Sequence, residues 1–168
     1  MKPTDKDAII ACCRQHQVVD QWFIEPAQVV TADWIRFKCQ FGCDSYGASL
    51  CCPPHTPSAA ATRRILDEYQ VALLLSFAGE EAATTALVAL ERDLFLLNYY
   101  KVISFAVGRC TRCDACSLNR CSHPTQARPS MQACGIDVFG TLRSTGIAID
   151  VVADKETPVR RYALLLIE

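Results

Sequence analysis

The feature that most constrains this chain is a run of closely spaced cysteines, Cys110-Thr111-Arg112-Cys113-Asp114-Ala115-Cys116, which is followed by Cys121. Thiols separated by only two residues cannot spread out along the backbone, so the chain must coil around whatever they hold. Iron–sulfur clusters are held by runs of this kind, whereas zinc more often binds two separated C-x2-C pairs. The spacing favours an iron–sulfur cluster of the 4Fe–4S type over zinc or disulfides. The predicted cluster ligands are Cys110, Cys113, Cys116 and Cys121.

Cys121 fits this pattern less closely than the other three cysteines. It follows Cys116 after four residues and precedes Ser122-His123-Pro124, whereas bacterial ferredoxin runs have three residues and then Cys-Pro. The fourth ligand is therefore open at this stage, and Cys51 and Cys134 are the other candidates.

Length and composition place the chain among globular proteins. It has 168 residues, of which 51% are hydrophobic, and a formal net charge of -1. We expect one domain over residues 1–168. We expect no membrane association, and the near-neutral net charge does not predict binding to nucleic acid. The start lacks the apolar core of a signal peptide, so we expect a cytoplasmic protein. Thiols stay reduced there, and the eleven cysteines are interpreted as metal ligands or reactive groups before disulfides.

A second group of cysteines, Cys39, Cys43, Cys51 and Cys52, lies within fourteen residues. The alternation of apolar and polar residues from Trp34 predicts a half-buried strand that carries Cys39 on its inner face. Because neighbouring side chains of an extended backbone point opposite ways, we expect Cys52 rather than Cys51 to face the centre. The predicted ligands of this metal centre are Cys39, Cys43 and Cys52. The alternative is a loop held together by buried thiols.

Hydrophobic periodicity predicts helices at residues 5–16, 57–69, 80–99 and 137–144, and strands at residues 18–24, 34–39, 71–77, 102–107, 147–153 and 162–167. In the third helix, Glu91 is expected on the solvent side. The strand–helix–strand pattern of residues 71–107 is typical of a βαβ unit, and the last two strands form a predicted hairpin. The expected fold is a single α/β domain with a mixed, mostly parallel sheet flanked by helices. Both cysteine groups follow strands, so we expect cysteine-rich metal-binding loops at one sheet edge.

Charge near the cysteine run indicates what else the site could bind. One acid, Asp114, and four arginines lie between residues 109 and 128, namely Arg109, Arg112, Arg120 and Arg128. One interpretation is that the arginines offset the negative charge of the thiolates. The other is a basic rim that docks an acidic redox partner protein or an anionic small molecule.

A family resemblance rests on Lys38-Cys39, Phe41-Gly42-Cys43, Cys52-Pro53-Pro54, Gly108-Arg109-Cys110-x2-Cys113-x2-Cys116, Arg128-Pro129-Ser130-Met131 and Gly135-Ile136-Asp137-Val138. In these motifs the chain resembles the cysteine-rich predicted metal-binding proteins of unknown function (domain of unknown function 2284). The resemblance implies that the protein binds a metal. It also implies that seven cysteines belong to the family's pattern, namely Cys39, Cys43, Cys52, Cys110, Cys113, Cys116 and Cys121. The chain departs from the family pattern at Ser122-His123 and at Gln132, and neither change removes a thiol.

Three functions are compatible with these patterns. The first is an iron–sulfur protein, with one cluster or two, that transfers electrons or senses redox state. The second is a metal-dependent enzyme acting on a small substrate, and the third is a zinc-stabilised structural or binding module. No nucleophile or phosphate-binding motif is present, so the sequence leaves open whether the chain is an enzyme. Its oligomeric state is likewise open.

Overall fold

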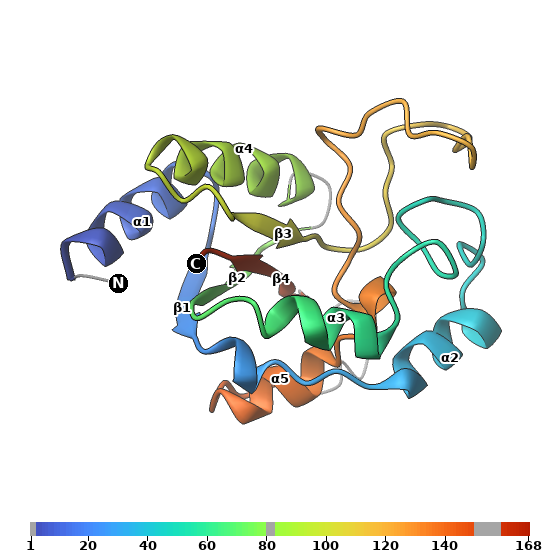
Figure 1. The fold of residues 1–168 in the computed structure, drawn as a ribbon, viewed down its shortest axis with the longest axis horizontal. Helices are drawn as coiled ribbons and strands as arrows, with labels where there is room; N and C mark the ends of the chain where they lie inside the picture. Colours follow the sequence, from blue (N-terminus) through green and yellow to red (C-terminus); the bar gives the residue numbers. More distant parts are fainter. Residues whose placement is uncertain (1–2, 80–82, 150–158) are drawn as a thin grey trace.

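The computed structural model describes residues 3–79, 83–149 and 159–168, and places a four-stranded sheet between two layers of helices (Figure 1). The strands are β1 (Asp20–Ile24), β2 (Ala72–Phe77), β3 (Ile103–Phe105) and β4 (Arg161–Leu166). The helices are α1 (Pro3–Gln15), α2 (Asp33–Gly42), α3 (Ala59–Leu66), α4 (Ala83–Leu96) and α5 (Val138–Ser144), with the short 3-10 helices η1 (Pro26–Gln28) and η2 (Gln132–Cys134). Helices α1 and α4 cover one face of the sheet, and α3 and α5 cover the other.

The strand order is β1-β2-β4-β3, and every neighbouring pair is antiparallel. The prediction of a mostly parallel sheet is therefore wrong. Strands β2 and β3 do run in the same direction on either side of α4, but β4 is inserted between them, as in a split βαβ unit. Residues 163–167 of the last segment are all apolar and buried, which suits a central strand covered on both faces.

Alternate residues of the central strands face the two helical layers. Leu73 and Leu75 of β2 pack with α1 and α4, while Leu74 packs with the layer that contains α3 and α5. In α1, Ile9 and Cys13 are fully buried in the first of these layers. Cys13 is therefore a packing residue, because a buried thiol acts as a small apolar side chain.

The segment from Trp34 is a helix, α2, and not the strand predicted from its alternation. Only Ile35 is buried, while the side chains of Phe37 and Phe41 are 65% and 71% exposed and their rings lie 4.8 Å apart. Arg36 holds the helix in place, because its Nη1 donates hydrogen bonds to the carbonyl oxygens of residues 56, 57 and 133. These contacts come from segments distant in the sequence, so the local alternation of residues could not predict that this segment is a helix.

The second helical layer is closed by local capping interactions. The Ser58 hydroxyl accepts a hydrogen bond from Ala61 N as the N-cap of α3, which begins at Ala59, two residues after the predicted start, while Asp137 caps α5 by accepting from Gly140 N. Gly135 ends η2 with a φ of 76°, and a Cβ there would lie 2.8 Å from Ala59 Cβ. Only glycine permits this close approach of η2 to α3.

The predicted strand at residues 147–153 falls partly within the described residues. Residues 147–149 are not in a strand, and the rest of that strand, with most of the predicted hairpin connection, lies outside the described residues. Among the helices that the structure describes, none has the length and apolar character needed to cross a membrane.

Candidate metal centre

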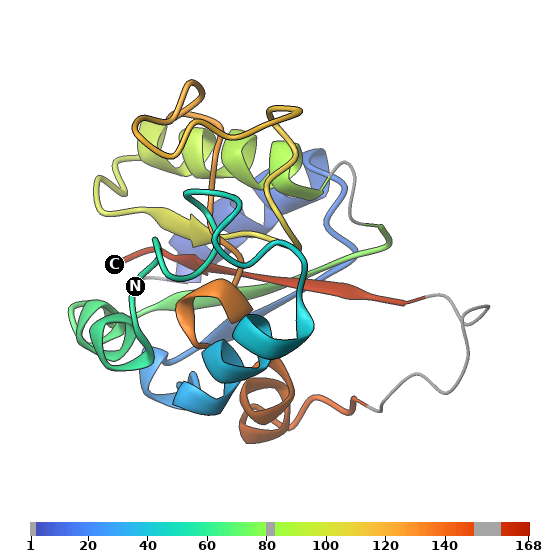
Figure 2. The ribbon, with the colours of Figure 1, turned by 90° about the vertical axis from the view of Figure 1, so that its right-hand side faces the viewer.

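The cysteine run lies on a long loop, residues 108–128, called the cysteine loop below. The loop leaves the carboxyl end of β3, and the two chain segments that flank it are joined at its base. Ala106 N donates to Pro129 O over 2.7 Å, and Ala106 forms a parallel bridge with Ser130. Figures 1 and 2 show this loop beside the loop that connects α2 to α3. The two cysteine groups therefore meet at one edge of the sheet.

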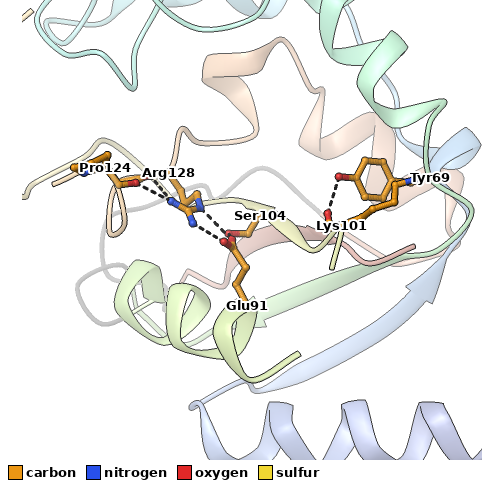
Figure 3. A network of polar contacts seen from close by, with 7 residues as sticks. Tyr69, Glu91, Lys101, Ser104, Pro124 and Arg128 are labelled. Carbon is orange, nitrogen blue, oxygen red and sulfur yellow. Dashed lines mark hydrogen bonds and ion pairs between the residues drawn. The ribbon is translucent and has the colours of Figure 1, made fainter. Parts of the chain in front are cut away.

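A buried ion pair attaches the end of the cysteine loop to α4 (Figure 3). The Arg128 guanidinium donates to both carboxylate oxygens of Glu91, with Nε 3.0 Å from Oε2. Ser104 of β3 donates to the same Oε2 over 2.6 Å, and Arg128 Nη1 donates to the Pro124 and Ala127 carbonyls. Glu91 is buried, so its predicted placement on the solvent side of the helix is wrong.

All four cysteines of the run face one narrow cavity of about 20 Å³ beneath the loop. The cysteines that line it are Cys51, Cys110, Cys113, Cys116 and Cys121. The fifth thiol comes from the α2–α3 loop, where Cys51 is buried and lines the cavity beside Cys110. Five thiols from two loops thus surround one small space, which we call the first thiol group.

Cys39, Cys43 and Cys52 form a second thiol group beside the first. Cys39 lies in the last turn of α2, Cys43 follows the helix as its C-cap, and Cys52 is buried in the loop. The Cys52 thiol lies within electrostatic range of Cys39 and Cys43, and also of Cys110 and Cys116. An open cavity of about 580 Å³ reaches Cys52 and the cysteine run, and its other walls include Ser45, Ser49, Arg109, Thr111 and Asp114.

Crowding of the thiols disfavours their ionisation. Burial, followed by the neighbouring Cys110, raises the pKa of Cys51 from 9.0 to about 12. Burial also raises the pKa of Cys52 and of Cys39, and in both the nearby Cys43 thiol adds to the effect. A bound cation removes this mutual repulsion, because thiolates are the ligand form of cysteine and metal binding releases their protons.

The donor set of both groups is the one that soft metal ions and iron–sulfur clusters prefer. Within residues 3–79, 83–149 and 159–168, however, no three Cys, His, Asp or Glu side chains are placed so that they could hold a single metal ion. The thiols converge on shared cavities without forming a closed coordination shell. The donor set suits a metal group in its composition but not in the spacing of its side chains.

Comparison with protein families identifies residues 22–167 as matching the family described as predicted metal-binding protein (DUF2284). The chain belongs to this family. The resemblance expected from the cysteine motifs is thereby confirmed, and so is the expectation of a metal-binding protein at the level of that description. The match covers both thiol groups and the whole sheet except the first two residues of β1. No curated protein and no solved structure matches the chain significantly.

Cys134 lines neither of the two cavities that the thiol groups share. Cys134, a candidate fourth ligand, is fully buried in the core layer that contains α3 and α5, and its carbonyl accepts a hydrogen bond from Thr62. Burial raises the pKa of its thiol to about 12. His55 is exposed on the α2–α3 loop, while the backbone carbonyl of the partly buried His123 accepts hydrogen bonds from residues 126 and 127. Cys134 is therefore a core residue in this fold.

From the sequence, Cys51 is only an alternative fourth ligand and is not placed beside Cys110. An extended backbone would turn Cys51 away from the centre that Cys52 faces, but Ser49 folds residues 49–52 into a tight turn, with its side chain accepting from Cys51 N and its carbonyl accepting from Cys52 N. In a turn, adjacent side chains need not point to opposite sides. The serine two residues before the cysteine pair was the available signal, because serine hydroxyls often support such turns.

The four arginines near the cysteine run have different roles. Arg128 is neutralised by Glu91, and Arg112 donates to Thr85 Oγ1 of α4 over 2.6 Å. Arg109 and Arg120 are exposed, and in the described part of the chain neither has a hydrogen bond or an ion pair. Only the last two are free to bind an anion from solution.

Proposed function

We propose that the protein binds an iron–sulfur cluster of the 4Fe–4S type at Cys110, Cys113, Cys116 and Cys121, and that it acts in electron transfer or redox sensing. The observation that carries this proposal is the convergence of all four thiols of the run on one cavity. Three cysteines at two-residue gaps with a further cysteine are the arrangement that such clusters use. When bound, the cluster would supply one-electron chemistry.

The chain's own residues support this role. The Glu91–Arg128 pair holds the loop against α4, so the thiols are gathered before any metal arrives. The buried Cys51 adds a fifth thiol to the lining of the cavity. The motif cysteines are only partly buried, so an electron could enter or leave directly from the surface.

The proposed partner is an acidic redox protein or an anionic small molecule. The charges that favour such a partner are those of Arg109 and Arg120, which are exposed beside the cysteine run and have no partner within the described residues. Exposed positive charge raises the rate of encounter with an acidic surface, and salt screens the effect.

Metal and acid-labile sulfide analysis of protein purified without oxygen tests the proposal. We expect brown protein that contains iron and sulfide and bleaches on reduction. Colourless protein with tightly held zinc and no sulfide would overturn the iron–sulfur proposal and support the zinc-stabilised module. Purification in air is to be avoided, because exposed thiolates oxidise.

A pair of cysteine variants separates ligation from packing. Cys113→Ser should lose nearly all iron and sulfide together with much of the fold, because metal binding is coupled to folding. Cys12→Ser should keep both, at a cost of about 1 kcal/mol in the free energy of unfolding, because Cys12 packs against the core between α1 and α4. Equal iron contents in the two purified variants would refute the assignment.

A further inference from the structure

Helix α4 is apolar on two sides. Leu87, Leu90 and Leu94 are fully buried and pack in the core layer that α4 forms with α1. Away from this layer, the side chains of Phe95 and Leu96 are 55% and 71% exposed. A helix that is hydrophobic all round is normally covered all round. The exposed apolar side of α4 therefore indicates a surface that binds something.

A cavity of about 820 Å³ lies over this exposed side. Its walls are α4, the segment before β3 and the end of the cysteine loop, and its apolar lining consists of Val88, Ala89, Phe95, Leu96 and Val102. The helical residues of this lining recur three or four residues apart, so they share one side of α4. Sites for small molecules are hollows of about 300–1,000 Å³ with mostly apolar walls and a few polar groups. The cavity has the size and the lining of such a site.

The charges at this cavity favour an anionic group on the bound molecule. Glu91 and Arg128 line it but neutralise each other, as Figure 3 shows, and Asp93 Oδ2 lies 2.6 Å from His16 Nε2 on α1. Arg92 is the remaining charged residue of the lining, and within the described residues its guanidinium has no hydrogen bond or ion pair. A guanidinium next to apolar walls is suited to a carboxylate, to which it donates charge-assisted hydrogen bonds.

This cavity shares a wall with the first thiol group. Gln126 and Arg128 line the apolar cavity, whereas Ala127 between them lines the small cavity of the cysteine run. Arg112, which also lines the thiol cavity, donates a hydrogen bond to Thr85 in the lining of the apolar cavity. A molecule bound over α4 therefore lies against the same loop that carries the thiols.

We propose that this cavity binds a small monocarboxylate with an apolar body, either a medium-length aliphatic chain or an aromatic ring. Arg92 binds the carboxylate, and the apolar residues of α4 and Val102 cover the body. The site goes beyond the proposed cluster and does not depend on it, because none of the cysteines lines this cavity. Binding should also restrain the cysteine loop through residues 126–128.

Isothermal titration of the full chain, reduced and purified without oxygen, tests the site with octanoate and with naphthoate. We expect one saturable site with a Kd below about 1 mM for the carboxylate whose body fits. The stronger of the two ligands identifies the body as chain or ring. Acetate, which lacks the body, and octanol, which lacks the charge, should bind much more weakly. In metal-free protein the bound carboxylate should slow the alkylation of Cys113 by maleimide.

Two variants separate the charge from the cavity. Arg92→Gln should weaken carboxylate binding by about tenfold, because a charge-assisted hydrogen bond is lost, without changing the weak binding of octanol. Ala89→Trp should abolish binding of all these ligands, because the larger side chain fills the cavity. Arg64→Gln is the matched control, since Arg64 is equally exposed but lies on α3 in the other helical layer, and it should bind as the unaltered chain does. Urea unfolding of each variant confirms that folded proteins are compared.

Two results would overturn the proposal. One is the absence of saturable binding of either carboxylate at about 1 mM, or binding that Arg92→Gln and Ala89→Trp leave unchanged. The other is a dimer in sedimentation that Leu96→Asp makes monomeric, which would show that a second copy of the chain covers α4. If the protein holds no iron or sulfide and octanoate or naphthoate still binds as expected, the cluster proposal fails and this site stands.

Discussion

At the scale of single residues, the surroundings of each thiol divide the eleven cysteines into ligand candidates and packing residues. Cys13 and Cys134 are fully buried among apolar side chains in the two core layers, away from the loops that carry the other thiols. Burial raises the pKa of each to about 12. Their value to the fold is packing, and it depends on the thiol staying neutral.

The raised pKa values of Cys13 and Cys134 should make the free energy of unfolding fall at alkaline pH. Below pH 9 both thiols are protonated in the folded and the unfolded chain, so they contribute no pH dependence. Between pH 9.0 and about 12 the unfolded thiols lose their protons while the folded ones keep theirs, so the unfolded state gains stability. The free energy of unfolding should fall by at most about 1.4 kcal/mol per pH unit for each thiol. Urea unfolding of metal-free protein across this range measures the slope.

The double variant Cys13→Ala, Cys134→Ala is the control for this dependence. It should start from a lower stability, because two buried side chains are truncated, but its slope between pH 9.0 and about 12 should be smaller. A slope identical to that of the unaltered chain would assign the alkaline loss to other groups.

At the scale of elements, α4 acts as the platform of the cysteine loop. Thr85 accepts a hydrogen bond from Arg112 in the loop, and Glu91 binds Arg128 at the loop's end. One helix therefore fixes the loop at two points, two turns apart. The helix itself was predictable from its leucine spacing, but its loop-facing side was assigned to solvent because its charged residues have partners distant in sequence.

Replacing Glu91 by glutamine tests whether the Glu91–Arg128 pair holds the cysteine loop to α4. Breaking a buried ion pair from one side costs about 3–5 kcal/mol, because the guanidinium of Arg128 stays buried without its counter-charge. We expect a lower urea midpoint and faster alkylation of Cys113 by maleimide in metal-free protein, as the loop loosens. The neighbouring exposed residue provides the control, since Arg92→Gln should change stability by less than about 0.5 kcal/mol. Equal effects of the two variants would show that the pair does not hold the loop.

At the scale of the whole molecule, β4 is the strand that joins the two halves of the sheet. It pairs with β2 over residues 161–166 and with β3 over residues 164–166. Without it β3, from which the cysteine loop leaves, would have no hydrogen-bonded connection through the sheet to β1 and β2. The position of the metal site therefore depends on the last strand of the chain.

Truncating a β4 side chain should therefore be far costlier than truncating one at the sheet edge. Leu165→Ala should lower the free energy of unfolding by about 2–5 kcal/mol, because a fully buried side chain is removed from the core between the sheet and α4. Ile103→Ala on the edge strand β3, where the side chain is 37% exposed, should cost less than about 1 kcal/mol. Chemical denaturation of both variants measures the difference, and similar costs would contradict a central role for β4.

The sequence by itself determined the local features of this protein. The cysteine groupings, the cap at Asp137, the glycine at Gly135 and the apolar strands 72–77 and 161–166 depend on residues close together in the chain, so spacing and residue type were sufficient or nearly so. The start of α3, two residues after the predicted one, required the structure.

The tertiary structure alone decided which segments meet. The insertion of β4 between β2 and β3, the helical state of α2, the Glu91–Arg128 pair and the place of Cys51 beside Cys110 all join residues far apart in sequence. Their stability depends on burial and on partners summed over the whole fold, and a local pattern carries no record of either. For that reason the thiols and their division into two neighbouring groups could be predicted from the sequence as candidates, while the place of Cys51 beside the cysteine run could not.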